Sequence, residues 1–262
     1  MSRHLRVFFV GGLISYRALF GFLSLWIFVP TLILTPIFQI LLFAYIGRAA
    51  GARSDEFYVV GNAIQCSSVP CLFAMTQTIA DERFYQTLGP ILISPAGRLP
   101  VFLGRAVPVI LNGAFVAAFA LFAGGLILGV SFDGAAWARL VPVLCVATFS
   151  CTGLGLVNAA LGLRIRETAV LSNVFVGLLL IFCGANVPLS ALPAWMAEIG
   201  RGLPLTHAIE AARAVAAGGS LASVRGLLGR ELLIGAIYSA AGFGLIRFLE
   251  LQSRRHATLE RA

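Results

Sequence analysis

Five stretches of this chain carry no charged side chain, and each exceeds the roughly 20 apolar residues that a helix needs to cross a bilayer. They are residues 18–47, 57–80, 106–132, 140–163 and 168–197. In lipid, the backbone amides of such segments find partners only in helices or closed barrels. These long, unbroken windows favour helices, so the sequence predicts an all-α integral membrane protein.

A sixth apolar window, residues 232–246, is shorter than the other five. Arg230 and Glu231 precede it and Arg247 and Glu250 follow it, and we expect these side chains to reach the headgroups from the helix ends. The sequence thus predicts six spans, at about residues 25–46, 57–79, 104–130, 140–162, 168–187 and 230–250.

Residues 5–20, ahead of the first span, mix Arg6 and Arg17 with apolar side chains. This pattern predicts an N-terminal interfacial helix, although an extension of the first span is the alternative. No soluble domain or repeat interrupts the pattern, so we expect residues 1–262 to form a single transmembrane domain.

The composition excludes several classes of activity. Only 11% of the residues are charged, against about 25% in soluble domains, and the chain contains no lysine. A phosphate-binding loop with its lysine is therefore absent, as is any Schiff-base lysine. The sequence also lacks the common zinc-protease and serine-hydrolase motifs, so we expect no enzyme activity, no cofactor and no metal. We interpret the cysteines as small buried apolar side chains: Cys66, Cys71, Cys145, Cys151 and Cys183.

The arginines are distributed unevenly between the two sides of the predicted spans. Twelve fall on the side of the N-terminus and seven on the other side. Cytoplasmic loops of membrane proteins carry the excess of positive charge, so both termini and residues 81–98 are predicted to be cytoplasmic. We interpret the net charge of +8 in this way and not as a sign of nucleic-acid binding.

A polar island, residues 81–98, lies between the second and third predicted spans. It opens with two acids and a base: Asp81, Glu82 and Arg83. Apolar side chains at helical spacing follow: Phe84, Leu88, Ile91 and Leu92. Ser94 and Pro95 then stop any helix. We interpret the island as a cytoplasmic coupling helix that docks a partner; the alternative is that its charges only cap the second span at the headgroups.

Residues 188–225, between the fifth and sixth spans, form no ordinary loop. Pro188, Pro193 and Pro204 divide them into short apolar pieces, and Trp195 suits a membrane interface. Arg213 lies three residues after Glu210 and is spaced to pair with it. Broken apolar pieces are tolerated at membrane depth when they pack on protein, so we expect a re-entrant extracytoplasmic segment of one or two short helices.

The polar residues of the clean windows are neutral: Gln39, Asn62, Gln65, Gln77, Asn112, Asn158, Asn173 and Asn186. Hydrogen bonding between helices is the simpler interpretation of these side chains, and lining of a substrate path is the alternative. Gly125 and Gly129 have the spacing of a close-packing motif for helices. No window carries an acid suited to proton coupling, so the energy for any transport must come from another protein.

Two groups of residues resemble the permease subunits of type-2 ABC exporters. The first combines an acidic-basic pair, a Thr-Leu turn and a Ser-Pro break: Glu82, Arg83, Thr87, Leu88, Ser94, Pro95, Gly104 and Arg105. The second precedes the sixth span: Pro188, Leu192, Pro193, Trp195, Leu203, Pro204, Leu205, Thr206 and Arg213. Gln86 and Gly89 stand where the family has glycine and glutamate.

The resemblance implies a permease of the bacterial cytoplasmic membrane that works with two ABC ATPase subunits, a second permease copy or a related permease, and the surrounding lipids. It implies that ATPase coupling falls to residues of the island: Asp81, Glu82, Arg83, Thr87, Leu88, Leu92, Ser94 and Pro95. Substrates in such systems include drugs, lipids and lipid-linked polysaccharides. The alternative from another class is a six-helix scaffold or assembly protein that transports nothing.

The arginine asymmetry leads to a prediction about topology. A cysteine placed at Asp55 or Asp133 should react with a membrane-impermeant thiol reagent added outside intact cells, whereas one placed at Arg98 should react only after the cells are opened. Labelling of position 98 from outside would contradict the predicted orientation.

Overall fold

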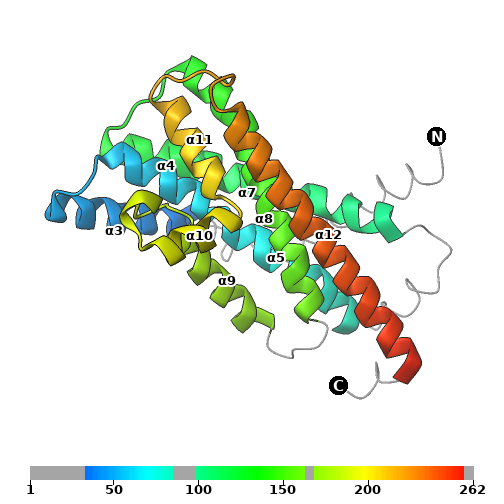
Figure 1. The fold of residues 1–262 in the computed structure, drawn as a ribbon. Helices are drawn as coiled ribbons and strands as arrows, with labels where there is room; N and C mark the ends of the chain where they lie inside the picture. The colour runs from blue at the N-terminus through cyan, green and yellow to red at the C-terminus, as the bar shows by residue number, and fades with distance from the viewer. Residues whose placement is uncertain (1–32, 85–97, 163–167, 257–262) are drawn as a thin grey trace.

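The computed structural model describes residues 33–84, 98–162 and 168–256, and within these parts it is helical and contains no strand (Figure 1). The elements are α3 Thr35–Ala50, α4 Asp55–Cys66, α5 Ser68–Phe84, α7 Arg98–Leu128, α8 Gly134–Gly162, α9 Thr168–Phe182, the 3-10 helix η2 Leu189–Ala191, α10 Ala194–Gly202, α11 Thr206–Ala216 and α12 Arg225–His256. The prediction of an all-α protein is therefore confirmed for this part of the chain.

Four helical segments of the described chain are long and apolar enough to cross a membrane: Asp55–Gln77, Gly104–Leu128, Gly134–Gly162 and Arg225–Leu249. The helices α3 and α9 are apolar but shorter. The first predicted span begins outside the described residues, as does the whole interfacial helix predicted at residues 5–20. The count of six spans therefore stays a prediction.

The second predicted span consists of two helices, α4 and α5, that meet at Ser67. Pro70 has no N–H to offer the carbonyl of Cys66, so the helical ladder is interrupted at this point. The hydroxyl of Ser67 donates to the carbonyl of Ile64 at 2.6 Å and so supplies a hydrogen bond to one carbonyl at the break. The two pieces together still form one continuous candidate span.

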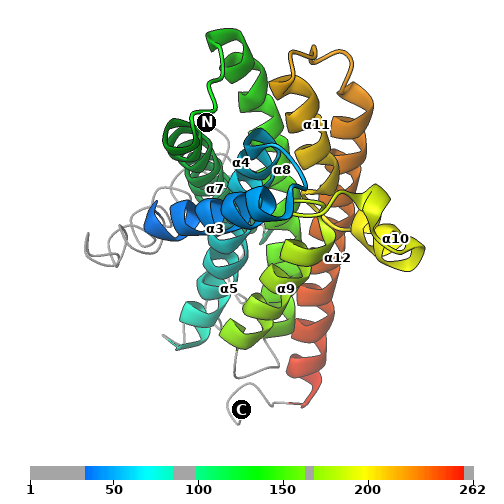
Figure 2. The ribbon, with the colours of Figure 1, turned by 90° about the vertical axis from the view of Figure 1, so that its left-hand side faces the viewer.

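The long helix α8 is the common packing partner of the bundle, in contact with α5, α7, α9, α11 and α12. Its closest neighbour is α12, which runs beside it in both views (Figures 1 and 2). A methyl group added at Gly153 would lie 2.7 Å from the carbonyl oxygen of Gly235, and one added at Gly235 would lie 2.7 Å from the Cα of Ser150. Glycine therefore sets the separation of α8 and α12.

The structure corrects the interpretation of Gly125 and Gly129 as a motif for packing between helices. Gly129 has a φ of 73° just past the end of α7, and the N–H of Val130 bonds back to the carbonyl of Gly125 at 2.8 Å. This arrangement closes the C-terminus of α7. The spacing of the two glycines reflects a helix end and not a contact with another helix.

The sixth window lies within a longer helix, and one expectation about the cysteines needs correction. Helix α12 is the longest described helix and begins at Arg225, although its charge-free window is the shortest of the six. Of the five cysteines, Cys145 is exposed and the other four are buried. A window bounded by charges marks the apolar centre of a helix and says little about where the helix begins.

The close contact between α8 and α12 gives a prediction about stability. Gly235→Ala forces a methyl group against the backbone of α8 and should lower the free energy of unfolding by about 1–3 kcal/mol. The matched control is Gly229→Ala on the same helix, where a methyl group meets nothing within 4 Å. Thermal unfolding in detergent measures both, and equal midpoints for the two variants would contradict the glycine-set contact.

Candidate functional site

Three short helical pieces connect α9 to α12 and include most of the predicted re-entrant segment. Pro188 precedes η2, Pro193 precedes α10, and Pro204 lies in the turn between α10 and α11. Figure 2 shows α10 projecting away from the bundle while α11 lies alongside α12. Trp195 on α10 is 62% exposed, and its ring meets that of Phe182 edge-on at 6.3 Å. Whether these pieces re-enter the membrane stays a prediction.

A buried acid from α12 holds the start of α11. The side chain of Glu231 is fully buried, and its Oε1 accepts the N–H of Leu205 at 2.6 Å. Its Oε2 accepts the N–H groups of His207 and Ala208 at 3.1 and 3.3 Å. These amides have no partner within α11, and the positive end of the helix dipole favours a carboxylate.

The position of Glu231 corrects the expectation that it reaches the headgroups from a helix end. The side chain instead points into the protein, toward a segment more than 20 residues earlier in the chain. Its place beside Arg230, at the edge of an apolar window, is typical of a snorkelling residue and concealed this role. The one sequence signal for this role is that Glu231 is an acid at the edge of an apolar window, because acids are seldom buried without a partner.

The acid also stabilises an unusual backbone turn. Leu205 has a φ of 74° and is the only described residue other than glycine with a positive φ. Such a conformation costs an ordinary residue about 1–3 kcal/mol unless its surroundings hold it. The side chain of Leu205 is fully buried, and its N–H is one of the three that Glu231 binds. The turn after Pro204 thus depends on a contact with α12.

Arg213, in the last turn of α11, attaches the other end of this helix to the bundle. Its guanidinium donates to the carbonyls of Gly184 at 2.9 Å, Ala185 at 2.8 Å and Phe57 at 3.1 Å. It also lies 3.5 Å from the centre of the Phe57 ring. Burial lowers the pKa of Arg213 to about 10, which leaves it charged at neutral pH. The predicted pairing with Glu210 is wrong, because Arg213 binds backbone carbonyls and Glu210 is exposed.

A cluster of amide side chains joins α3, α4 and the loop after α9. The Nε2 of Gln39 donates to Oδ1 of Asn62 at 3.0 Å and to Oε1 of Gln65 at 2.6 Å. The Nδ2 of Asn62 donates to Oδ1 of Asn186 at 2.9 Å. Asn186 follows directly on the carbonyls that Arg213 binds, so the cluster and the arginine fix the same loop.

A second amide contact lies deeper in the bundle. The Nδ2 of Asn158 on α8 donates to Thr76 on α5 at 2.8 Å and to Ser172 on α9 at 2.7 Å. Hydrogen bonding between helices was the simpler interpretation of the polar residues, and it is confirmed for these two clusters. It does not extend to Asn173, which bonds to the carbonyl of Ala169 in its own helix, or to Gln77, which is exposed.

The predicted coupling residues lie at the limit of the described chain. Asp81, Glu82 and Arg83 fall in the last turn of α5. The others lie outside the described residues: Thr87, Leu88, Leu92, Ser94 and Pro95. The coupling role of these residues therefore stays a prediction.

Among the residues that the structure does describe, no three His, Cys, Asp or Glu side chains gather as a metal site would require.

Comparison with known proteins bears on the whole chain. A model of the family described as ABC-2 type transporter matches residues 13–216. The "Probable multidrug ABC transporter permease YbhR" of Escherichia coli strain K12 is 27% identical over 149 residues, which cover 53% of this chain and 40% of that protein. The protein of the same name in Escherichia coli O157:H7 matches to the same extent. The match thus covers less than half the length of either relative.

The cap on α11 gives a prediction about the outer segment. Glu231→Ala leaves three buried N–H groups without an acceptor and should lower the free energy of unfolding by about 2 kcal/mol. Hydrogen exchange should increase across residues 205–216. The matched control is Glu198→Ala, which removes an exposed ion pair with Arg201 and should cost less than about 1 kcal/mol. Identical exchange in the two variants would show that the cap does not hold α11.

Proposed function

Because the chain belongs to the ABC-2 type transporter family, we propose that it is the membrane-spanning permease of an ATP-binding cassette exporter. The family match covers most of the chain and is the observation that carries the proposal. The chain is thus a multi-pass membrane protein and a transport subunit, not an enzyme. Outward transport across the bacterial cytoplasmic membrane, and a drug, lipid or lipid-linked polysaccharide as substrate, are the finer parts of the proposal.

The energy source we propose is a separate ATPase. The chain has no lysine and hence no phosphate-binding loop of the Walker type, which supports hydrolysis of ATP by another subunit. We propose two such ATPase subunits beneath a pair of permeases, either two copies of this chain or this chain with a related one. The excess of arginine on the N-terminal side supports cytoplasmic termini and a docking face on that side.

We propose that the island at residues 81–98 receives the motion of the ATPases. Its first three charged residues close α5, so a push on the island acts along that helix. Helix α5 packs on α8, and Asn158 on α8 joins Thr76 and Ser172 of the helices on either side. Helix α8 in turn contacts α11 and α12. This chain of packed helices offers a physical route from the island to the outer segment.

We propose that the outer segment, residues 188–225, closes the path on the far side of the membrane. Its helix α11 is fixed at both ends by charged groups, Glu231 and Arg213, and would move with α12 and α4 as one body. The exposure of Trp195 on the projecting α10 supports a contact with the membrane interface or with a second permease. Glu231 and Arg213 would then be positioning residues, which hold α11 in place and need not touch the substrate.

Partner binding and transport test the proposal together. Glu82→Ala should weaken binding of the co-expressed ATPase by about 30-fold or more, since removing one partner of a buried charge pair costs roughly 2–5 kcal/mol. Leu88→Asp and Leu92→Asp should act alike by disrupting the apolar contact. The measurements are a pull-down of the ATPase at equal expression and ATP-driven uptake of a dye drug into inverted vesicles, chosen because the relatives are named as multidrug permeases.

The matched control is Asp133→Asn, which removes an exposed negative charge at the start of α8, on the opposite side in the proposed topology, while the amide oxygen can still accept the N–H of Ala136 as the carboxylate does. It should leave both measurements unchanged. If all three island variants keep the ATPase and full transport, the island is not the coupling element. If no ATPase is retained by the unaltered chain, the proposed permease function itself is wrong.

A further inference from the structure

A groove of about 750 Å³ lies between α7 and α12, away from the outer segment. Both helices pack on α8, but within the described residues they have no extensive contact with each other. The floor comes from α8 and includes Thr152, Gly153 and Leu156. Its volume falls within the roughly 300–1,000 Å³ that ligand sites occupy.

Small residues contribute to both walls of the groove. Ala106 belongs to the α7 wall, and Ala240 and Gly244 belong to the α12 wall. A methyl group added at Gly244 would meet nothing within 4 Å. The hydroxyl of Thr152 donates to the carbonyl of Thr148 at 2.7 Å, so it is satisfied within its own helix. The groove thus presents an apolar surface with few polar groups that need a hydrogen-bond partner from a ligand.

One end of the groove is positively charged. Arg247, near the end of α12, is exposed and is the charged residue among the described lining. An apolar channel with arginine at its mouth is complementary to a molecule that has an anionic head and a hydrocarbon chain.

We propose that this groove binds one acyl chain of an anionic phospholipid whose phosphate lies at Arg247. Two charges of the same sign repel, so the arginine disfavours a cationic amphiphile at this mouth. A zwitterionic lipid fits the apolar surface but gains less from the arginine. The site lies within one protomer and goes beyond the proposed transport function, because it requires neither an ATPase nor a second permease.

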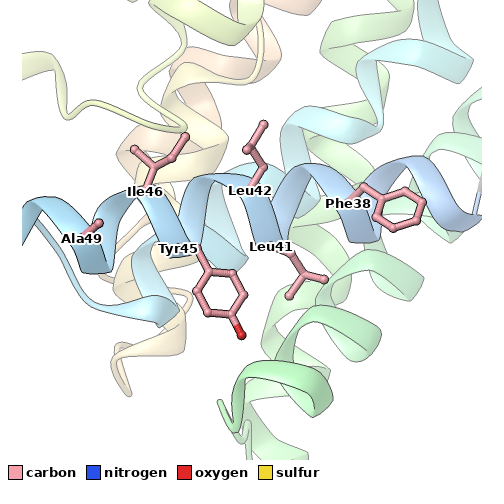
Figure 3. A pocket seen from close by; sticks show the side chains of 6 residues that line it. All are labelled: Phe38, Leu41, Leu42, Tyr45, Ile46 and Ala49. Carbon is pink, nitrogen blue, oxygen red and sulfur yellow. The ribbon is translucent and has the colours of Figure 1, made fainter.

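The apolar hollow on α3 shows why charge matters to this assignment. Six side chains of that helix outline about 610 Å³: Phe38, Leu41, Leu42, Tyr45, Ile46 and Ala49. Figure 3 shows them spread along the one helix, with no facing wall from another element among the labelled residues. None of the six is charged, and Arg48, whose guanidinium lies 5.2 Å from the centre of the Tyr45 ring, is already paired with Asp55. The groove between α7 and α12 has two walls, a floor and a cation.

Native mass spectrometry of the purified chain tests the proposal, with phosphatidylglycerol and phosphatidylcholine of identical acyl chains as probes. The unaltered chain should retain phosphatidylglycerol in preference to phosphatidylcholine. Arg247→Gln should weaken phosphatidylglycerol binding about five-fold, since one arginine near a lipid surface contributes on the order of 1 kcal/mol. Gly244→Leu should fill the groove and weaken both lipids.

Matched controls exist on the same helix. Gly229→Leu adds the same side chain at an exposed glycine with open space, and Arg225→Gln removes an exposed arginine at the opposite end of α12. Both should bind lipid like the unaltered chain. Leucine replaces glycine in a helix at no loss of helix propensity, and thermal unfolding verifies that each variant is folded.

Two results would overturn the proposal. One is that Gly244→Leu binds both lipids as well as Gly229→Leu does, and that Arg247→Gln binds phosphatidylglycerol as well as Arg225→Gln does. The other is that the unaltered chain and Arg247→Gln each retain phosphatidylglycerol and phosphatidylcholine equally. Neither result bears on ATPase capture, so failure of the lipid site and failure of the permease function are distinguishable.

Discussion

The architecture depends on satisfying backbone groups where helices end in apolar surroundings. At the start of α11 the carboxylate of Glu231 accepts three amides, and at the end of α9 the guanidinium of Arg213 binds two carbonyls. An unpaired backbone group in such a place costs several kcal/mol, whereas helices satisfy only their interior. The broken outer segment is therefore possible because Glu231 from α12 completes the start of α11, while Arg213 of α11 binds the carbonyls that follow α9. Pro204 breaks the helix, and Glu231 makes the break tolerable.

Helix α8 lies between the three regions to which we assign functions. Its contact with α5 leads toward the island, its contact with α11 leads to the outer segment, and its residues Thr152, Gly153 and Leu156 form the floor of the groove between α7 and α12. Gly153 allows α12 to approach closely and also lines that groove. A change in the separation of α8 and α12 would alter the groove and the position of Glu231 together. One helix pair thus connects the proposed lipid site to the outer segment.

The charge-free windows predicted the helical class and the general position of the long spans, because burial in lipid leaves a continuous signal in the chain. The helix breaks at Pro188, Pro193 and Pro204 follow from local chemistry in the same way. What the windows missed depends on contacts between distant residues. Glu231 binds amides more than 20 residues earlier, and Arg213 binds Phe57 from the other half of the chain. No spacing along the sequence encodes such pairs, and the i, i+3 rule favoured Glu210 for Arg213 instead.

The cap on α11 also orders the assembly of the protein in time. A ribosome makes Leu205, His207 and Ala208 before it makes Glu231, the acceptor of their N–H groups. Until α12 emerges, α11 has no carboxylate at its start, and the left-handed turn at Leu205 keeps the bond from the Thr206 hydroxyl to the Gly200 carbonyl but lacks its contact with Glu231. The carboxylate likewise has no partner until it meets α11, so α12 carries an uncompensated acid into an apolar environment. The two segments therefore settle as a pair, and α11 reaches its final place only after α12 has been synthesised.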